Sequence, residues 1–282
     1  MNRLKQLERC GQSLWLDYLR RDLIEEGELL TLVERDGLKG VTSNPSIFEK
    51  AIAETELYAN ALKECQVQSD HSVSAIYEEL AIADIRAAAD VLRPVYDLTE
   101  RRDGYVSLEC SPYLADSTEA TVTEALRLRA RVSRSNLMIK VAATPAGIPA
   151  IRELTGHGVN VNVTLLFSVN VYEQVVEAYI SGLEDLARLG GDVSKVASVA
   201  SLFVSRVDTA IDKRLDRHDK RAARLLRGKI GIANAKLAYA DYKMLFSGPR
   251  WQSLVALGAK TQRGIGRSHP WRSRTSAWPG CT

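Results

Sequence analysis

The residue whose type and setting most suggest chemistry is a lysine inside an apolar run. Lys140 lies in Leu-Met-Ile-Lys-Val-Ala, residues 137–142, and a parallel strand buried on both faces ordinarily carries no charge. Burial disfavours the ammonium form and lowers the pKa of a lysine, which leaves a free amine that can form a Schiff base with a ketone. The alternative is a lysine at the strand end whose amine reaches solvent, and Lys140 alone leaves both interpretations open.

Polar side chains also stand at the ends of other predicted strands, where the reactive groups of a parallel barrel gather. Five positions fit this description: Asp17, Asn44, Glu109, Asn162 and Thr164. Glu109 has the chemistry to shuttle protons. Each position taken singly can be explained as a cap or turn residue, as for Asn44 before Pro45 and Thr164 before an apolar run. Together with a buried lysine, the five favour an active site.

A hydroxyl and a guanidinium flank a predicted helix start after the sixth strand. Ser201 and Arg206 lie in Ser-Val-Ala-Ser-Leu-Phe-Val-Ser-Arg, residues 198–206. Backbone N–H groups at a helix N-terminus attract anions, and arginine offers two parallel donors, so the segment suits a phosphate. Arg206 can equally pair with Asp208 or Asp212 on a solvated helix face.

The elements that must position these residues alternate along the chain. Short runs rich in β-branched residues are followed by longer stretches of helical periodicity, which is typical of an α/β fold with a parallel sheet. We predict strands at Ser13–Asp17, Lys39–Ser43, Tyr105–Glu109, Leu137–Ala142, Val159–Val163 and Lys195–Ala200. We predict helices at Glu56–Cys65, Ser72–Leu92, Ser117–Ser133, Thr144–Thr155, Ser168–Leu189, Arg206–Asp216 and Asp219–Phe246, with Pro94 closing the second.

Composition limits the class of protein. The chain of 282 residues falls within the range of single-domain α/β barrels, and no apolar run reaches the roughly 20 residues of a membrane helix. The first residues lack a signal-peptide core, so we expect a cytoplasmic protein without a membrane partner. Four cysteines and four histidines are scattered, which predicts reduced thiols and no metal site. Beyond Asp241 there are seven basic and no acidic residues, but no nucleic-acid-binding pattern.

Five longer segments carry a resemblance to a known family. They are GVTSNPSIFEKAI, VSLECSPYLADST, NLMIKVAATPAGIPAI, VNVNVTLLFS and SVASLFVSRVD. With them the chain resembles transaldolases, notably the longer type of cyanobacteria, actinobacteria and plastids, from near residue 10 to about Arg263. The resemblance implies a TIM-type (β/α)₈ barrel that uses neither cofactor nor metal. It also implies phosphorylated sugars as substrates and no nucleic-acid partner.

The activity implied is the transfer of a dihydroxyacetone unit from sedoheptulose 7-phosphate to glyceraldehyde 3-phosphate, in the non-oxidative pentose phosphate pathway. By similarity Lys140 forms the Schiff base, and Glu109 acts through a water that Thr164 helps to hold. Asp17 takes the proton from the hydroxyl whose loss breaks the carbon–carbon bond. The resemblance further implies that the remaining substrate-binding residues are Thr42, Asn44, Asn162, Ser201 and Arg206.

The chain departs from the family pattern after Arg263. Residues 264–282, GIGRSHPWRSRTSAWPGCT, show neither strand nor helix periodicity where the family has strands seven and eight. We therefore expect an incomplete barrel domain over residues 1–263, without regular strands seven and eight, and a divergent, disordered basic tail over residues 264–282. The tail resembles out-of-frame translation, and the hypothesis of a frameshifted or prematurely ended product predicts a family-like C-terminus in another reading frame of the gene.

Two other functions stay open on the sequence. The first is a Schiff-base fructose-6-phosphate aldolase, which splits the ketose and releases free dihydroxyacetone. The second is an inactive, truncated remnant of a transaldolase, because an open barrel lacks part of its pocket wall.

Overall fold

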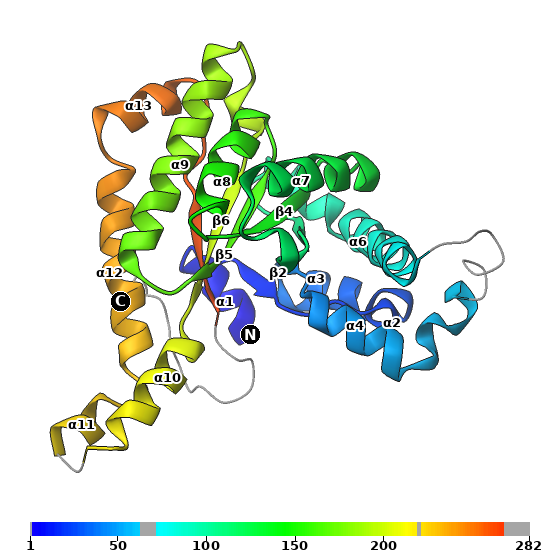
Figure 1. Ribbon diagram of the computed structural model, residues 1–282, viewed down its shortest axis with the longest axis horizontal. Coiled ribbons are helices and arrows are strands. Elements are labelled where there is room, and N and C mark those ends of the chain that lie inside the picture. The colour runs from blue at the N-terminus through cyan, green and yellow to red at the C-terminus, as the bar shows by residue number, and fades with distance from the viewer. Residues whose placement is uncertain (1, 63–71, 219–220, 268–282) are drawn as a thin grey trace. The chain divides into compact units, whose positions relative to one another are not determined.

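The computed structural model describes residues 2–62, 72–218 and 221–267, in which helices and strands alternate (Figure 1). The strands form one sheet of seven, and their order in the sheet follows their order in the sequence. The chain divides into two compact units, Met1–Cys110 with Glu124–Ile139 and Ser111–Thr123 with Lys140–Thr282. Strand β4 (Leu137–Ala142) and helix α7 (Thr118–Val132) run from one unit into the other.

The first unit contains three further strands in parallel pairs, β1 with β2 and β2 with β3. The strands are β1 (Leu14–Leu16), β2 (Leu38–Thr42) and β3 (Tyr105–Glu109). The helices are α1 (Arg3–Arg9), α2 (Arg21–Glu25), α3 (Glu28–Asp36), α4 (Pro45–Glu54), the 3₁₀ turn η1 (Glu56–Tyr58) and α6 (Val73–Leu98). The predicted bounds of β3 and β4 are confirmed.

Helix α6 carries the apolar face that covers β2 and β3. Its buried residues recur at helical spacing, among them Ile85, Leu92 and Tyr96. The prediction that Pro94 closes this helix is wrong, because Pro94 lies inside α6, which continues to Leu98. Burial of Val95 and Tyr96 after the proline favours one more turn, despite the hydrogen bond that proline cannot donate.

The second unit is built on strands β5, β6 and β7, again in parallel pairs. The strands are β5 (Val161–Leu166), β6 (Ser198–Phe203) and β7 (Arg263–Arg267). The helices are α8 (Gly147–Gly156), α9 (Val169–Arg188), α10 (Ser205–Leu215), α11 (Arg221–Leu226), α12 (Ile230–Leu245) and α13 (Pro249–Ala256), with 3₁₀ turns η2 (Pro112–Leu114) and η3 (Val193–Lys195).

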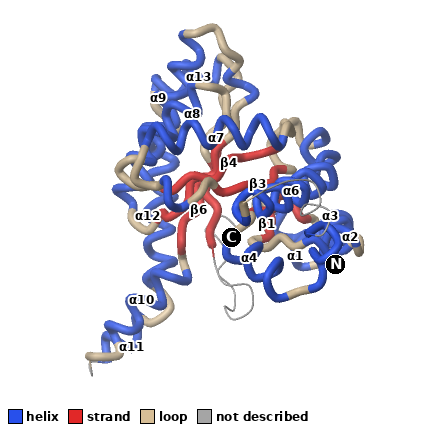
Figure 2. The backbone as a smooth tube through the Cα atoms, turned by 45° about the vertical axis from the view of Figure 1, so that its right-hand side comes forward, coloured by secondary structure: helices blue, strands red, loops and turns tan. Residues whose placement is uncertain are grey.

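Helix α9 is the centre of the helical layer of the second unit. It contacts α8, α12 and α13, and Figure 1 shows it between α8 and α12. Its buried residues include Val175, Val176, Tyr179 and Leu183, which form one stripe at helical spacing. In Figure 2, α10 and α11 extend away from the strands of this unit. The single helix predicted over 219–246 is instead two helices, α11 and α12, and residues 219–220 lie outside the described part of the chain.

A seventh strand is present where the sequence predicted none. β7 pairs in parallel with β6 from Val199↔Arg263 to Phe203↔Arg267. The prediction failed because Gly-Ile-Gly has little strand propensity of its own, while the exposed edge of β6 supplies a backbone partner. Within the described residues there is no eighth strand, and residues 268–282, the rest of the predicted tail, lie outside them. The predicted α/β class of a TIM-type barrel that lacks part of its sheet is confirmed.

The structure bears on two further expectations, about membrane-spanning helices and about the oxidation state of the cysteines. No described helix has both the length and the apolar character that a membrane crossing requires. Cys110 is a free, buried thiol, whereas Cys10 is disulfide-bonded, which corrects the expectation of a reduced thiol at that position.

Candidate active site

In the first unit, four of the predicted site residues follow or end the parallel strands. Asp17 directly follows β1, Thr42 ends β2, and Glu109 ends β3. Asn44 stands immediately before α4. Since the three strands are parallel, these positions share the C-terminal edge of the sheet. Asp17 is exposed, Asn44 and Glu109 are half-buried, and Thr42 is buried.

The end of β2 is fixed to β3 by a double contact. The backbone N–H of Ser43 donates to the carbonyl of Ser107 at 3.2 Å, and its hydroxyl donates to the same oxygen at 2.7 Å. Thr42 pairs with Ser107 in the sheet register, and its buried hydroxyl oxygen has no hydrogen-bond partner among the described residues. A buried hydroxyl of this kind is suited to a ligand or a water molecule.

A glycine on β2 makes room for the strand that precedes Asp17. A Cβ atom at Gly40 would lie 2.4 Å from the indole ring of Trp15, so only glycine lets the ring lie against this strand. Trp15 and Gly40 are also partners in the sheet register. This packing fixes β1, and with it the position at which Asp17 leaves the strand.

In the second unit, all the predicted site residues except Arg206, which is exposed on α10, lie inside strands and are buried. Lys140 is 1% exposed on β4, and Asn162 and Thr164 on β5 are 0% and 1% exposed. Ser201 on β6 is 0% exposed, and its hydroxyl donates to the side-chain oxygen of Asn162 at 2.8 Å. The structure therefore joins Asn162 and Ser201 directly, although the sequence offered no reason to pair them.

Strand β5 contains an irregularity at the predicted site. Its register with β6 shifts between Val163 and Leu166, and Leu165 has a left-handed backbone with φ of 62°. Thr164 sits in this irregular stretch, and its carbonyl accepts the N–H of Ala143 at 2.9 Å. Bulges and strained residues of this type cluster beside active sites, because they re-aim a side chain out of the regular pleat.

Comparison with known proteins decides the family. The sequence pattern described as Transaldolase/Fructose-6-phosphate aldolase matches residues 14–263. The chain belongs to this family. A transaldolase of Trichodesmium erythraeum (strain IMS101) is 47% identical over 270 residues, which cover 93% of this chain and 71% of that protein. The predicted family and the predicted type of enzyme, a transaldolase, are confirmed.

Two further relatives show the same extent of similarity. A protein of Nostoc sp. (strain PCC 7120) named Transaldolase 2 is 47% identical over 272 residues, covering 93% of this chain and 71% of that protein. A protein of Streptomyces avermitilis named Transaldolase 1 is 48% identical over 267 residues, covering 94% and 70%. The family match ends at Arg263, the first residue of β7 and the last before the predicted tail.

The aromatic residues of this transaldolase-family chain that sequence reasoning missed are Phe167 and Phe203. Their rings stack with centroids 5.0 Å apart and planes 12° apart. The guanidinium carbon of Arg206 lies 4.4 Å from the centroid of Phe203. Phe167 follows β5 and Phe203 ends β6, so an aromatic residue at a strand end was the signal that could have found them. The stack orients the predicted phosphate-binding arginine.

The alternative role for Arg206, an ion pair on its own helix, does not occur among the described residues. Asp208 instead accepts the backbone N–H of Gly231 at 2.7 Å, and Asp212 accepts that of Gly228 at 3.1 Å. Both carboxylates thus hold the segment that leads into α12. Arg206 is exposed, and its guanidinium group lies over the ring of Phe203.

The neighbours of Glu109 stay uncharged at neutral pH. Burial raises the pKa of Tyr77 to about 12, and the negative charges of Glu49 and Glu109 add to the effect. Burial likewise raises the pKa of Cys110 to about 12, reinforced by Glu124 and Glu109. Neither the phenol nor the thiol is therefore a base or nucleophile at pH 7.

Within residues 2–62, 72–218 and 221–267, no group of three or more His, Cys, Asp or Glu side chains is placed to hold a metal ion. The groups available at the strand ends are carboxylates, amides, hydroxyls and one buried amine.

Proposed function

We propose that this chain transfers a dihydroxyacetone unit from sedoheptulose 7-phosphate to glyceraldehyde 3-phosphate through a Schiff base on Lys140. The observation that carries the proposal is a lysine 1% exposed within β4 of a chain that matches the transaldolase family over residues 14–263. Burial at this level favours the neutral amine, which is the nucleophilic form. The products are erythrose 4-phosphate and fructose 6-phosphate, and the reaction takes place in the cytoplasm.

The first step joins the amine of Lys140 to the C2 carbonyl of the ketose. Nitrogen attack forms a carbinolamine, and loss of its hydroxyl as water forms the protonated imine. Glu109 supplies and removes the protons through a water molecule that Thr164 helps to hold, which is general acid–base catalysis. The half-buried Glu109 and the buried Thr164 suit these roles.

The second step breaks the bond between C3 and C4. Asp17 removes the proton from the C4 hydroxyl, the C3–C4 electron pair moves into the imine, and erythrose 4-phosphate leaves as an aldehyde. The nitrogen ends as a neutral enamine, so Asp17 need only be a modest base. The enamine then attacks the aldehyde of glyceraldehyde 3-phosphate, and hydrolysis of the new imine releases fructose 6-phosphate.

Binding of the substrate divides between hydroxyl and phosphate contacts. Asn44 and Asn162 hydrogen-bond the dihydroxyacetone hydroxyls, and Thr42 supports this pocket. The buried hydroxyl of Thr42, which has no hydrogen-bond partner among the described residues, supports this role of Thr42. The hydrogen bond of 2.8 Å from Ser201 to Asn162 supports a fixed position for the Asn162 amide. Ser201 and Arg206 bind the phosphate, and the contact of Arg206 with Phe203 pre-orients the guanidinium.

The test is a turnover assay with and without an acceptor. With fructose 6-phosphate as donor, product should form only when erythrose 4-phosphate is supplied, and Lys140→Ala should lower kcat/KM at least about a thousand-fold. Lys195→Ala is the matched control, because Lys195 is 63% exposed and ion-paired with Asp192. Equal turnover without acceptor would instead identify a fructose-6-phosphate aldolase. A folded chain with no turnover in either assay would support the inactive remnant.

A further inference from the structure

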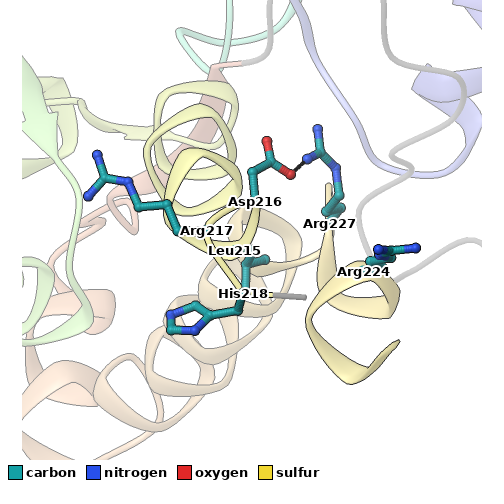
Figure 3. Close-up of a pocket in the computed structure, with 6 residues that line it drawn as sticks. All are labelled: Leu215, Asp216, Arg217, His218, Arg224 and Arg227. Atoms are coloured by element: carbon teal, nitrogen blue, oxygen red, sulfur yellow. Dashed lines mark ion pairs between the residues drawn. The ribbon is translucent and has the colours of Figure 1, made fainter. Parts of the chain in front are cut away.

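The start of α10 carries the proposed phosphate-binding arginine without a side-chain cap of its own. Arg206 is the second residue of this helix, and Val204, whose side chain has no hydrogen-bonding group, occupies the N-cap position. Beyond the other end of α10, Asp216 and Arg227 form an exposed ion pair (Figure 3). The start of the helix depends instead on contacts from a neighbouring element, and α12 is in contact with α10.

The first turn of α12 fixes the first turn of α10. The backbone N–H of Gly231 donates to the carboxylate of Asp208 at 2.7 Å. A Cβ atom at Gly231 would lie 2.5 Å from the carbonyl oxygen of Val204, so only glycine lets the two segments approach this closely. The residues on both sides of Arg206 therefore contact α12.

A side chain one turn further along α12 holds the end of β5. The amide Nδ2 of Asn234 donates to the carbonyl oxygen of Phe167 at 3.0 Å. Phe167 follows β5, in which Leu165 already departs from regular strand geometry with φ of 62°. Regular sheet pairing therefore does not determine the position of Phe167, and the hydrogen bond from α12 restrains it.

The ring of Phe167 connects this hydrogen bond to Arg206. It stacks on Phe203 with centroids 5.0 Å apart, and the ring of Phe203 lies 4.4 Å from the guanidinium carbon of Arg206. Arginine has many rotamers, and a guanidinium that rests on an aromatic face has lost part of this freedom before a ligand binds. Asn234 is thus linked to the guanidinium through two stacked rings, and all four residues belong to the second unit.

We propose that Asn234 is a positioning residue, which holds the guanidinium of Arg206 in the orientation that binds the substrate phosphate. It acts through Phe167 and Phe203 and does not touch the substrate. The inference rests on the proposed function in one respect, that Arg206 is the phosphate ligand. A guanidinium that is oriented in advance loses less side-chain entropy on binding, so Asn234 should affect the affinity for phosphorylated sugars and leave the chemical step unchanged.

The first experiment compares fructose 6-phosphate and fructose as donors, with D-glyceraldehyde, which has no phosphate, as acceptor. Asn234→Leu removes the amide and adds no charge. It should lower kcat/KM for fructose 6-phosphate about five-fold through KM, and leave kcat/KM for fructose unchanged, because fructose has no phosphate for Arg206 to bind. Asn170→Leu is the matched control, since Asn170 is exposed on α9 and takes part in none of these contacts, and it should change neither value.

A double-mutant cycle tests whether Asn234 acts through Arg206. Arg206→Gln should lower kcat/KM for fructose 6-phosphate by itself, and the addition of Asn234→Leu should lower it no further. Arg227→Gln, which breaks the ion pair beyond the other end of α10, should leave the value unchanged. Phe167→Leu interrupts the same series of contacts at the ring and should show the same selectivity for the phosphorylated donor, so it tests the inference even if Asn234→Leu fails to fold.

A binding measurement separates this inference from the proposed reaction. Lys140→Ala cannot form the Schiff base, so calorimetric titration of this variant with fructose 6-phosphate reports binding alone. Adding Asn234→Leu should weaken the affinity about five-fold, and this result in a chain that turns over no sugar would contradict the proposed function only. The inference is overturned by equal effects on the two donors, by independent effects of Asn234→Leu and Arg206→Gln, or by a fructose 6-phosphate affinity that is absent in Lys140→Ala or unchanged by Asn234→Leu.

Discussion

The two units of the chain present their proposed catalytic residues in different ways. In the second unit Lys140, Asn162, Thr164 and Ser201 lie within strands and are at most 1% exposed. In the first unit the acid–base groups Asp17 and Glu109 stand at strand ends and keep contact with solvent. In the proposed reaction the second unit therefore holds the buried amine and fixed hydrogen bonds, and the first unit supplies the groups that exchange protons.

Within the first unit, the largest expected effect comes from removing the proposed base. Asp17→Asn should lower kcat by about a hundred-fold or more, because the C4 hydroxyl loses its proton acceptor. The Schiff base on Lys140 should still form, since Asp17 takes no part in the proposed condensation step. Single-turnover kinetics with a borohydride quench measures both steps. Loss of adduct formation together with turnover would contradict the assignment of Asp17 to bond cleavage alone.

The next effect probes the support of β4 in the second unit. A Cβ atom at Gly147 would lie 1.9 Å from the carbonyl oxygen of Ala142, the last residue of β4. Gly147→Ala must displace α8 or the strand end, so we expect a loss of about 2 kcal/mol in unfolding free energy and a lower kcat. Chemical denaturation measures the unfolding free energy, and steady-state kinetics measures kcat. Gly248→Ala is the control, because its Cβ would meet nothing within 4 Å.

A smaller effect is expected from the aromatic support of Arg206. Phe203→Leu removes the ring that lies 4.4 Å from the guanidinium, and should raise KM for phosphorylated substrates about five-fold with little change in kcat. Steady-state kinetics separates the two parameters. A fall in kcat with unchanged KM would mean that Phe203 acts in the reaction itself and not through phosphate binding.

The smallest effect is expected from removing one surface ion-pair network in each unit. The Arg127 guanidinium holds the pKa of Glu78 below its usual value in the first unit, and Arg250 does the same for Glu177 and Glu184 in the second. A carboxyl with a lowered folded-state pKa stabilises the fold above its unfolded pKa and loses that contribution as pH falls through the folded value. Arg127→Gln and Arg250→Gln should each cost about 0.5 kcal/mol at pH 7, because solvent screens both networks.

The pH dependence is the check on these two variants. The difference in unfolding free energy between each variant and the unmodified chain should shrink as the pH falls below about 4, where glutamate ordinarily becomes protonated. Urea denaturation at a series of pH values measures it. A difference that stays constant down to pH 2 would show that the arginines act through packing of their side chains and not through charge.

Much of the fold followed from the sequence where local pattern and burial agree. The apolar runs at 105–109 and 137–142 predicted β3 and β4 with their observed bounds. Strand β6 starts later than predicted, because Asp192 accepts the N–H of Ser194 and forms the turn η3 over the first predicted residues. Strand β5 continues past its predicted end at Val163 to Leu166, through the irregular stretch at Leu165. The periodicity of the sequence gives no sign of this irregular stretch.

The candidate site was predictable in residue type more than in detail. The buried lysine on β4 stood out because charge is rare in such a strand, and its burial is confirmed. The Ser201–Asn162 hydrogen bond and the Phe167–Phe203–Arg206 stack depend on neighbouring strands, so no local pattern revealed them. β7 was missed for the same reason: its partner is β6, more than fifty residues earlier in the chain.

The central claim is that one amine, that of Lys140, condenses with the donor ketose. The most direct measurement is reduction with borohydride in the presence of fructose 6-phosphate, followed by digestion and mass mapping of the labelled side chain. The account predicts a single three-carbon dihydroxyacetone-derived or six-carbon label on Lys140 and none on the exposed Lys195. A label on any other lysine, with Lys140 unmodified in the folded chain, would contradict it.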